Sequence, residues 1–114
     1  MEAATVIQAL AALAQENRLA VFRLLVQAGP EGMPAGALAE AVGAPASSMS
    51  FHLAQLANAG LVSQRRQSRS IIYSADYAAM NDVLAYLMEN CCGGGECAPA
   101  ASCVPPVSQA KDAA

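Results

Sequence analysis

The chain has 114 residues, of which 55% are hydrophobic and 13% charged, and its formal net charge is −3. This length suits one domain with a modest core of several short helices. No run of eighteen apolar residues occurs and the first five residues lack the basic start of an export signal, so we expect a soluble, cytoplasmic protein without a membrane segment.

The first half of the chain predicts two helices, over residues 3–14 and 16–28, and the breaker run Gly29-Pro30-Glu31-Gly32 ends the second of them. In both helices apolar residues recur at helical spacing. The two predicted stripes are Val6, Ile7, Leu10 and Leu13 in the first helix, and Leu19, Phe22, Leu25 and Val26 in the second.

A closely spaced pair of helices is predicted next. Pro34 suits the start of a helix over 35–42, which Gly43 can end in a left-handed conformation. The second helix of the pair runs from Pro45 to Ala59, and its buried stripe is predicted to consist of Met49, Leu53 and Leu56. Two short helices joined by so tight a turn form a helix-turn-helix.

The remaining elements are a hairpin and a last helix. Residues 61–65 and 70–74 predict two strands, with 66–69 as the turn. A helix over 76–90 carries Met80, Leu84 and Leu87 on one stripe, which Cys91 continues. The fold class is therefore mainly α with a small β-hairpin. We divide the chain into a folded DNA-binding and dimerisation domain over 1–92 and a cysteine-containing, largely flexible tail over 93–114.

Positive charge is concentrated in one segment of the chain. Residues 41–75 contain three arginines and no acid, whereas the remainder holds all nine acids and three basic residues. A compact basic segment on an acidic chain is typical of an element that contacts DNA. A solvated turn with three arginines is the alternative interpretation.

The second helix of the pair also presents polar side chains opposite its apolar stripe. Hydroxyl and amide groups near a helix N-terminus suit phosphates and base edges in a major groove, although an ordinary solvated face has the same pattern. His52, the only histidine, is expected to contact DNA or to pack as a polar group. The residues predicted to bind DNA are Ser47, Ser48, Ser50, Phe51, His52, Gln55, Arg65, Arg66 and Arg69.

Three of the four cysteines come after the last predicted helix in the run Cys91-Cys92-Gly93-Gly94-Gly95-Glu96-Cys97, and Cys103 comes six residues later. The sulfurs of adjacent cysteines are badly placed to bond each other but can both face a third atom, and the glycines allow the chain to return. Three thiolates without an imidazole suit As(III) or Sb(III), with Cys91, Cys92 and Cys97 as the predicted ligands. Zinc, with Cys103 as a fourth ligand, and a disulfide-forming redox switch are alternatives.

The run from Ser47 to Val62 resembles the S-x-x-S-x-H-L-x-x-L-x-x-A-G-L-V signature of the ArsR/SmtB winged-helix repressors. Residues 66–73 resemble the R-x-G-R-x-x-x-Y wing of that family, with Ser68 in the place of the turn glycine. The resemblance covers about residues 5–92 and implies a winged helix-turn-helix homodimer that binds promoter DNA and leaves it when metal binds.

The resemblance also has gaps. Residues 35–41 lack the thiol box found in many arsenic sensors of the family, and the last helix lacks the histidines of its zinc sensors. The start at 90–92 with a later cysteine resembles instead a subset of arsenite-responsive members whose ligands lie at the end of the last helix.

From these features we expect an arsenite-responsive transcriptional repressor that dimerises through its first and last helices. Its partners would be double-stranded operator DNA and a second copy of the chain, and its inducer As(III) or Sb(III), with no organic cofactor. A thiol redox-responsive repressor and a zinc- or cadmium-responsive repressor are the alternatives. An enzyme is not expected, because neither Cys91 nor Cys92 has a recognisable base partner.

Overall fold

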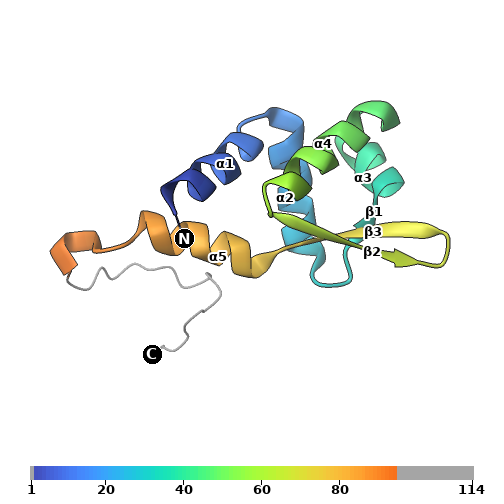
Figure 1. The fold of residues 1–114 in the computed structure, drawn as a ribbon. Helices are drawn as coiled ribbons and strands as arrows, with labels where there is room; N and C mark the ends of the chain where they lie inside the picture. Colours follow the sequence, from blue (N-terminus) through green and yellow to red (C-terminus); the bar gives the residue numbers. More distant parts are fainter. Residues whose placement is uncertain (1, 95–114) are drawn as a thin grey trace.

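The computed structural model describes residues 2–94, and the predictions for Cys97, for Cys103 and for most of the 93–114 tail lie outside that range. Figure 1 shows a helical body with a hairpin projecting on one side and the last helix on the other. The predicted class, mainly α with a β-hairpin, is confirmed. In chain order the elements are α1 (Ala3–Leu13), α2 (Glu16–Ala28), β1 (Met33–Pro34), α3 (Ala35–Val42), α4 (Ala46–Asn58), β2 (Val62–Gln67), β3 (Ser70–Ala75), α5 (Tyr77–Leu87) and a short 3₁₀ helix, η1 (Cys91–Gly94).

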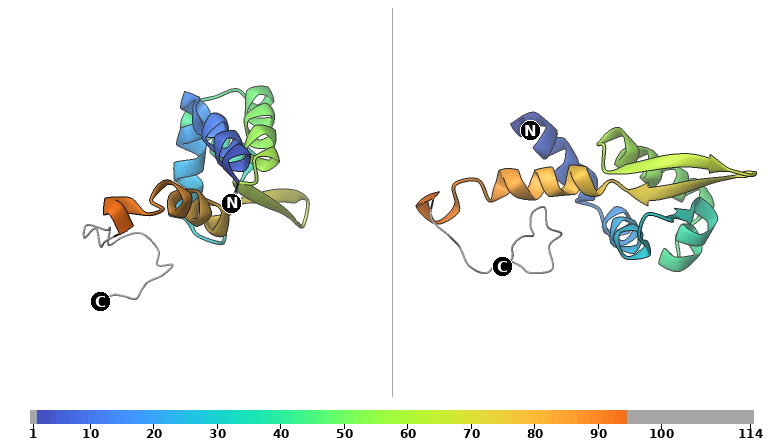
Figure 2. Two further views of the ribbon diagram at one scale, coloured as in Figure 1. Left: turned by 60° about the vertical axis from the view of Figure 1, so that its left-hand side comes forward. Right: turned by 90° about the horizontal axis from the view of Figure 1, so that it is seen from below.

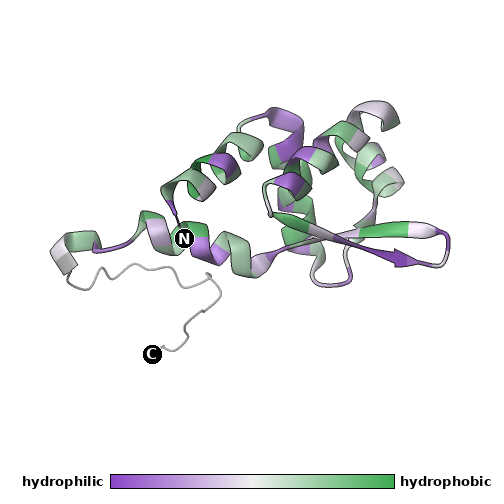
Figure 3. Cartoon of the chain, in the orientation of Figure 1, coloured by the Kyte–Doolittle hydropathy of each residue, from purple (hydrophilic) through white to green (hydrophobic). Residues whose placement is uncertain are grey.

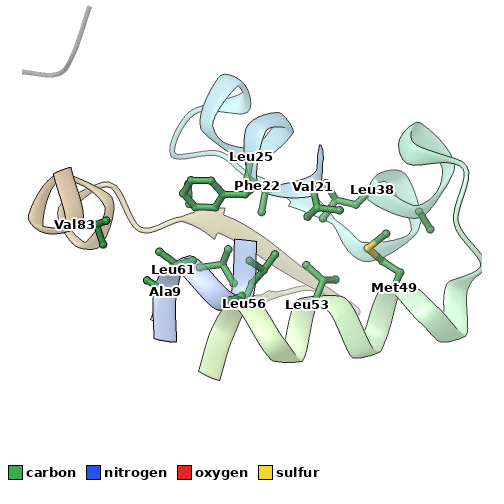
Figure 4. Close-up of a cluster of buried hydrophobic side chains, with 14 of the residues drawn as sticks. Ala9, Val21, Phe22, Leu25, Leu38, Met49, Leu53, Leu56, Leu61 and Val83 are labelled. Atoms are coloured by element: carbon green, nitrogen blue, oxygen red, sulfur yellow. The ribbon is translucent and has the colours of Figure 1, made fainter. Parts of the chain in front are cut away.

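The core forms where the helices meet the base of the sheet. Side chains from α2, α3 and α4 interdigitate there, and Ala9 of α1 and Val83 of α5 close the cluster at one end (Figure 4). Leu25, Leu38, Leu53 and Leu56 are among the completely buried side chains. None of the helices within residues 2–94 has the length and apolar character needed to cross a membrane.

The helix-turn-helix of α3 and α4 agrees with the sequence prediction. Gly43 ends α3 with a left-handed φ of 73°, a conformation that glycine adopts without steric cost. In α4 the predicted stripe of Met49, Leu53 and Leu56 is buried. The polar face of α4 is therefore directed away from the core.

The first helix buries only part of its predicted apolar stripe. Val6, Ala9 and Ala12 pack into the core, whereas Ile7 is 65% exposed and Leu10 is 42% exposed. Small alanines let α1 approach its neighbours closely, so the larger apolar residues remain outside. Of the predicted stripe, Val6 is buried and Leu13 packs against the core, whereas Ile7 and Leu10 lie on the surface.

The sheet contains one strand more than predicted. Its order is β1-β3-β2, and the two-residue β1 pairs antiparallel with β3 next to Gly32. The hairpin turn is also tighter than the predicted 66–69 turn, because Arg66 and Gln67 belong to β2 and only residues 68 and 69 connect the strands. Ser68 has a left-handed φ of 58°, which explains why glycine usually stands there.

Gly32 lies unusually close to the hairpin. A Cβ atom built at this position would lie 2.2 Å from the carbonyl oxygen of Tyr73 and 2.7 Å from Oγ of Ser74. Its φ of 71° also favours glycine. The absence of a side chain at position 32 therefore allows the loop between α2 and β1 to rest against β3.

The last helix is shorter than predicted. Asp76 caps its N-terminus by accepting a hydrogen bond from the backbone N–H of Ala79 at 2.9 Å, and the helix ends at Leu87 rather than at residue 90. Asn90 then adopts a left-handed φ of 57°, which breaks the helical path. The prediction that Cys91 continues the apolar stripe of this helix is consequently wrong.

Candidate nucleic-acid interface

The outward face of α4 presents small polar groups and one aromatic ring. Ser47 and Ser50 are exposed, Ser48 and Gln55 are half-buried, and Phe51 is 57% exposed. Pro45 precedes the helix in an extended conformation, so its first backbone N–H groups open onto this face. This arrangement provides hydroxyl, amide and backbone donors together with an apolar contact surface.

His52 does not belong to this exposed face. Its side chain is only 7% exposed, and its Nδ1 atom lies 3.4 Å from Nη1 of Arg18. Burial, and secondarily the positive charge of Arg18, lowers the pKa of His52 below its ordinary value of 6.5. The imidazole is therefore neutral at pH 7 and packs as a polar group, which was the second of its two predicted roles. His52 is therefore not part of the exposed face of α4, and a direct contact of its ring with DNA stays a prediction.

Arg65 is held at the base of the hairpin rather than at its tip. Its Nη2 atom donates to the carbonyl oxygen of Glu31 at 2.8 Å and lies 3.4 Å from Oε1 of Gln67. Its Nη1 atom lies 3.3 Å from the carbonyl oxygen of Pro30 and 3.2 Å from Oγ of Ser74. The guanidinium thus joins the hairpin to the loop before β1, and Arg65 lies in a strand, as the sequence predicts.

Arg66 and Arg69 remain available on the hairpin. Both are exposed, and Arg69 lies in the two-residue turn. Because successive side chains of a strand point to opposite faces, Arg66 faces away from the side that Arg65 occupies. Figure 3 shows the end of the hairpin as one of the most hydrophilic parts of the molecule. Arg65 is exposed too, but its guanidinium is engaged within the chain, so Arg66 and Arg69 are the two arginines directed outward from the hairpin.

The hairpin and α4 lie on the same side of the molecule. In Figure 1 both are on the side opposite α5, and α4 packs against β2. The views of Figure 2 show the hairpin extending well beyond the helical body. One surface therefore combines a polar helix face with a projecting basic hairpin.

The cysteines that the structure describes lie in the turn after α5. Cys91 is half-buried and Cys92 is exposed, and both belong to η1. Cys92 and Gly93 have left-handed φ values of 57° and 70°, so the chain reverses direction at this point. Among residues 2–94 no three His, Cys, Asp or Glu side chains are close enough together to hold a metal ion. The predicted three-sulfur site depends on Cys97, outside those residues, and stays a prediction.

A second surface, formed by α1 and α5, is apolar. The two helices contact each other and leave large side chains exposed to solvent. Figure 3 shows apolar residues along both helices. The large exposed apolar residues are Ile7 and Leu10 on α1, Leu84 and Leu87 on α5, and Met88 directly after α5.

Comparison with known proteins identifies the family of the chain. A helix-turn-helix domain model matches residues 13–65. The HTH-type transcriptional regulator YgaV of Escherichia coli is 34% identical over 83 residues, which are 73% of this chain and 82% of YgaV. The nodulation protein NolR of Rhizobium meliloti is 39% identical over 80 residues, which are 70% of this chain. The chain spans 63% of the length of that NolR protein.

Solved structures agree with the family in fold. An ArsR-like transcriptional regulator from Rhodococcus sp. RHA1 matches with a TM-score of 0.66 and 28% identity, over 74% of this chain and 76% of that one. NolR from Sinorhizobium fredii matches with a TM-score of 0.62 and 37% identity, over 76% and 84%. The chain belongs to the ArsR family of winged-helix transcriptional regulators. In this family member α4 is the recognition helix and the β2–β3 hairpin is the wing.

Two contacts of this ArsR-family chain were not predicted from its sequence, namely Arg18 with His52 and Arg65 with the loop before β1. The first joins residues 34 positions apart and carries no local pattern. The second had a usable signal, because strand alternation places Arg65 and Arg66 on opposite faces. Arg66 was predicted to lie in the turn rather than in the strand, so this signal was not used, and the structure shows that both residues belong to β2.

Proposed function

We propose that this chain is a cytoplasmic repressor that binds operator DNA as a dimer and leaves it when As(III) or Sb(III) binds Cys91, Cys92 and Cys97. The observation that carries the DNA-binding part is the arrangement of the α4 face and the wing. The apolar stripe of α4 is buried within the chain, so its serines and Phe51 face outward, and Arg66 and Arg69 of the wing are exposed as well. Serine hydroxyls and Phe51 suit a major groove, and arginines suit phosphates or a narrow minor groove.

The dimer part of the proposal rests on α1 and α5. Their exposed apolar residues form a surface that a second copy would bury through a two-fold contact. One structural neighbour with 28% identity and a TM-score of 0.60, Mb0332 from Mycobacterium bovis, is described as a homodimeric winged helix-turn-helix domain. In a dimer of this kind, two recognition helices would enter successive major grooves about 34 Å apart.

The position of the cysteines supports the link between ligand and DNA. Cys91 and Cys92 come after α5 and a short turn, so drawing Cys97 towards them would change the end of a dimer-forming helix. The ligand-bound end of α5 would fit only a dimer whose recognition helices are badly spaced for DNA. Ligand binding and DNA binding would then weaken each other, with a coupling free energy of about 1–3 kcal/mol. A neighbour with 28% identity and a TM-score of 0.61 is described as a possible transcriptional regulator for arsenical resistance.

A thiol redox switch is the second candidate. It is favoured by the structural match to HlyU from Vibrio cholerae, which was described in a reduced form and has 26% identity and a TM-score of 0.60. In this alternative, two thiols of the chain form a disulfide and lose two electrons and two protons to an oxidant such as a peroxide. Oxidant, rather than a metalloid, would then release the DNA.

A DNA-release assay separates the candidates. The protein is bound to a fluorescent duplex that it has selected from a random-sequence pool, under excess phosphine reductant, and As(III), Sb(III), Zn(II) and Cd(II) are added in turn. We expect release by As(III) and Sb(III) only. Release by Zn(II) or Cd(II) alone contradicts the metalloid assignment, and release only after peroxide replaces the reductant supports the redox switch.

Single cysteine variants test the ligand set in the same assay. We expect Cys91→Ser, Cys92→Ser and Cys97→Ser to bind DNA like the unmodified chain but to stay bound when As(III) is added. Cys103→Ser is the matched control and should still be released. If it too stays bound, the site uses four sulfurs rather than three.

A further inference from the structure

Arg18 connects three helices through one guanidinium group. Its Nε atom donates to the carbonyl oxygen of Ala12 at 2.7 Å, and its Nη1 atom lies 3.4 Å from Nδ1 of His52. Its Cζ atom lies 5.9 Å from the ring centroid of Phe51. Arg18 itself belongs to α2, so the group joins the end of α1 and the start of α2 to the recognition helix α4.

On the α1 side, Arg18 acts as a cap. The last four carbonyl groups of a helix lack partners within the helix, and Ala12 belongs to the last turn of α1. That turn contains no basic residue, so the guanidinium supplies both a donor and the positive charge that a helix C-terminus favours. The backbone N–H of Arg18 donates to Oε1 of Gln15 at 2.9 Å, which fixes the residue at the start of α2.

On the α4 side, Arg18 contacts two consecutive residues. The neutral His52 accepts through Nδ1, which places its proton on Nε2. The distance from the guanidinium to the Phe51 ring is within the range of a cation–π contact. The rings of Phe51 and His52 also meet edge to face, with centroids 5.9 Å apart and planes at 61°. An exposed ring on the DNA-facing side of α4 is thus held by a residue outside α4.

We propose that Arg18 is a positioning residue that sets the orientation of Phe51 and of α4 relative to the end of α1. This inference rests on the proposed function, because it concerns how α4 is presented to DNA. Since α1 belongs to the surface that a second copy would cover, Arg18 joins the dimer contact to the DNA contact within each protomer. A residue that only contacted a DNA phosphate would not link the position of α4 to that of α1, whereas Arg18 contacts both helices.

Replacement of Arg18 tests the proposal against a charge-matched control. Arg18→Met should weaken binding to the selected duplex of about 30 base pairs by about tenfold or more, with an unchanged slope of log K against log salt concentration. Arg23→Met removes the same charge from an exposed position on the same helix and should change the affinity less than about twofold. A slope reduced by about one would identify Arg18 as a phosphate ligand and overturn the proposal, as would an unchanged affinity.

Replacement of His52 tests the same connection while leaving the Ala12 cap intact. An asparagine oxygen can take the place of Nδ1, so His52→Asn should retain most of the affinity, whereas His52→Leu should lose about as much as Arg18→Met. The double variant Arg18→Met/His52→Leu should lose little more than either single variant. Additive losses would show that the two residues act independently, and the proposal would fail.

Nuclear magnetic resonance distinguishes a failure of this inference from a failure of DNA binding. In the DNA-free protein, the ring signals of Phe51 and His52 should shift in Arg18→Met and stay in place in Arg23→Met. Unchanged ring signals would overturn the positioning role even if DNA binding is confirmed. If the unmodified protein selects no duplex, DNA binding fails while the ring signals still test Arg18. Should Arg18→Met not fold, the His52 variants and Arg18→Lys, which keeps the charge but not the three simultaneous contacts, decide the outcome.

Discussion

The recognition helix α4 and the first helix α1 differ in which of their apolar side chains they bury. Both are amphipathic helices of similar length, α4 with 13 residues and α1 with 11. In α4 the large apolar side chains of Met49, Leu53 and Leu56 are buried and the polar ones face outward. In α1 the small alanines are buried and the large Ile7 and Leu10 face outward.

This difference separates the two kinds of partner. A helix that buries its apolar face in the core of its own chain exposes its polar groups, which can contact a polar ligand such as DNA. A helix whose largest apolar groups stay exposed is completed by another apolar surface. On this basis α4 and the wing are assigned to DNA, and α1 with α5 to a second copy.

The largest expected effect comes from introducing charge on the α1 and α5 surface. The double variant Leu10→Glu/Leu84→Glu places two carboxylates where apolar contact is proposed, so the dimer should dissociate because buried unpaired charge is strongly unfavourable. Loss of the second recognition helix should then weaken DNA binding by about 100-fold or more. Analytical ultracentrifugation measures the first effect and fluorescence anisotropy the second.

The matched control for that experiment is Gln27→Glu, an exposed position on α2 outside both surfaces. It adds a negative charge without touching α1 or α5, so the dimer should persist. A dimer that survives Leu10→Glu/Leu84→Glu would contradict the assignment of this surface, and dissociation in the control would attribute the effect to net charge alone.

A smaller effect is expected on the DNA side, where the three arginines of the wing should separate into two classes. Arg66→Ala/Arg69→Ala should weaken DNA binding and reduce the slope of log K against log salt concentration by about two, because each exposed guanidinium that contacts a phosphate releases counterions. Arg65→Ala should leave this slope unchanged, since its guanidinium is engaged by the Glu31 carbonyl and by Ser74. Anisotropy titrations over a salt series measure both. Equal slopes in the two variants would contradict the separation.

The smallest expected effect is a pH dependence of the free energy of unfolding that is caused by His52, which Arg18 connects to the end of α1. Because the pKa of His52 is lowered in the folded chain, the unfolded chain binds a proton more readily below pH 6.5. His52 should therefore leave the free energy of unfolding independent of pH above 6.5. Below pH 6.5 the free energy of unfolding should decrease as the pH falls towards the pKa of His52 in the folded chain. Urea unfolding at several values between about pH 8 and pH 5 measures the decrease.

The control for the pH series is His52→Asn, which cannot titrate. Since His52 is the only histidine, the difference between the two proteins isolates its contribution. A parallel decrease in both proteins would show that other groups are responsible.

The sequence predicted the whole buried face of α4 but only part of the buried face of α1, for a physical reason. In α4 serines and leucines alternate at helical spacing, so only one face can be buried. In α1 nearly every residue is apolar, so periodicity could not decide between a face of small residues and a face of large ones. Packing against α2 and α4 made that choice, and packing partners are not visible in a local pattern.

Other differences between sequence prediction and structure have equally specific causes. The strand β1 has two residues, which is too short to show alternation. The end of α5 was predicted too late because Cys91 extends the apolar spacing of Leu84 and Leu87, although the chain leaves the helical path by Asn90, which has a left-handed φ. The buried contact of His52 with Arg18 depends on how α2 packs against α4.

Because Gly32 packs against β3 without a side chain, a substitution at this position should affect the wing. Any side chain at position 32 would push the loop between α2 and β1 away from Tyr73 of the wing. A hairpin fixed at its root behaves as a lever, so a small displacement near Tyr73 becomes a larger one at Arg69. We therefore expect Gly32→Ala to change the direction of the wing and to weaken DNA binding, although position 32 lies outside the residues assigned to DNA.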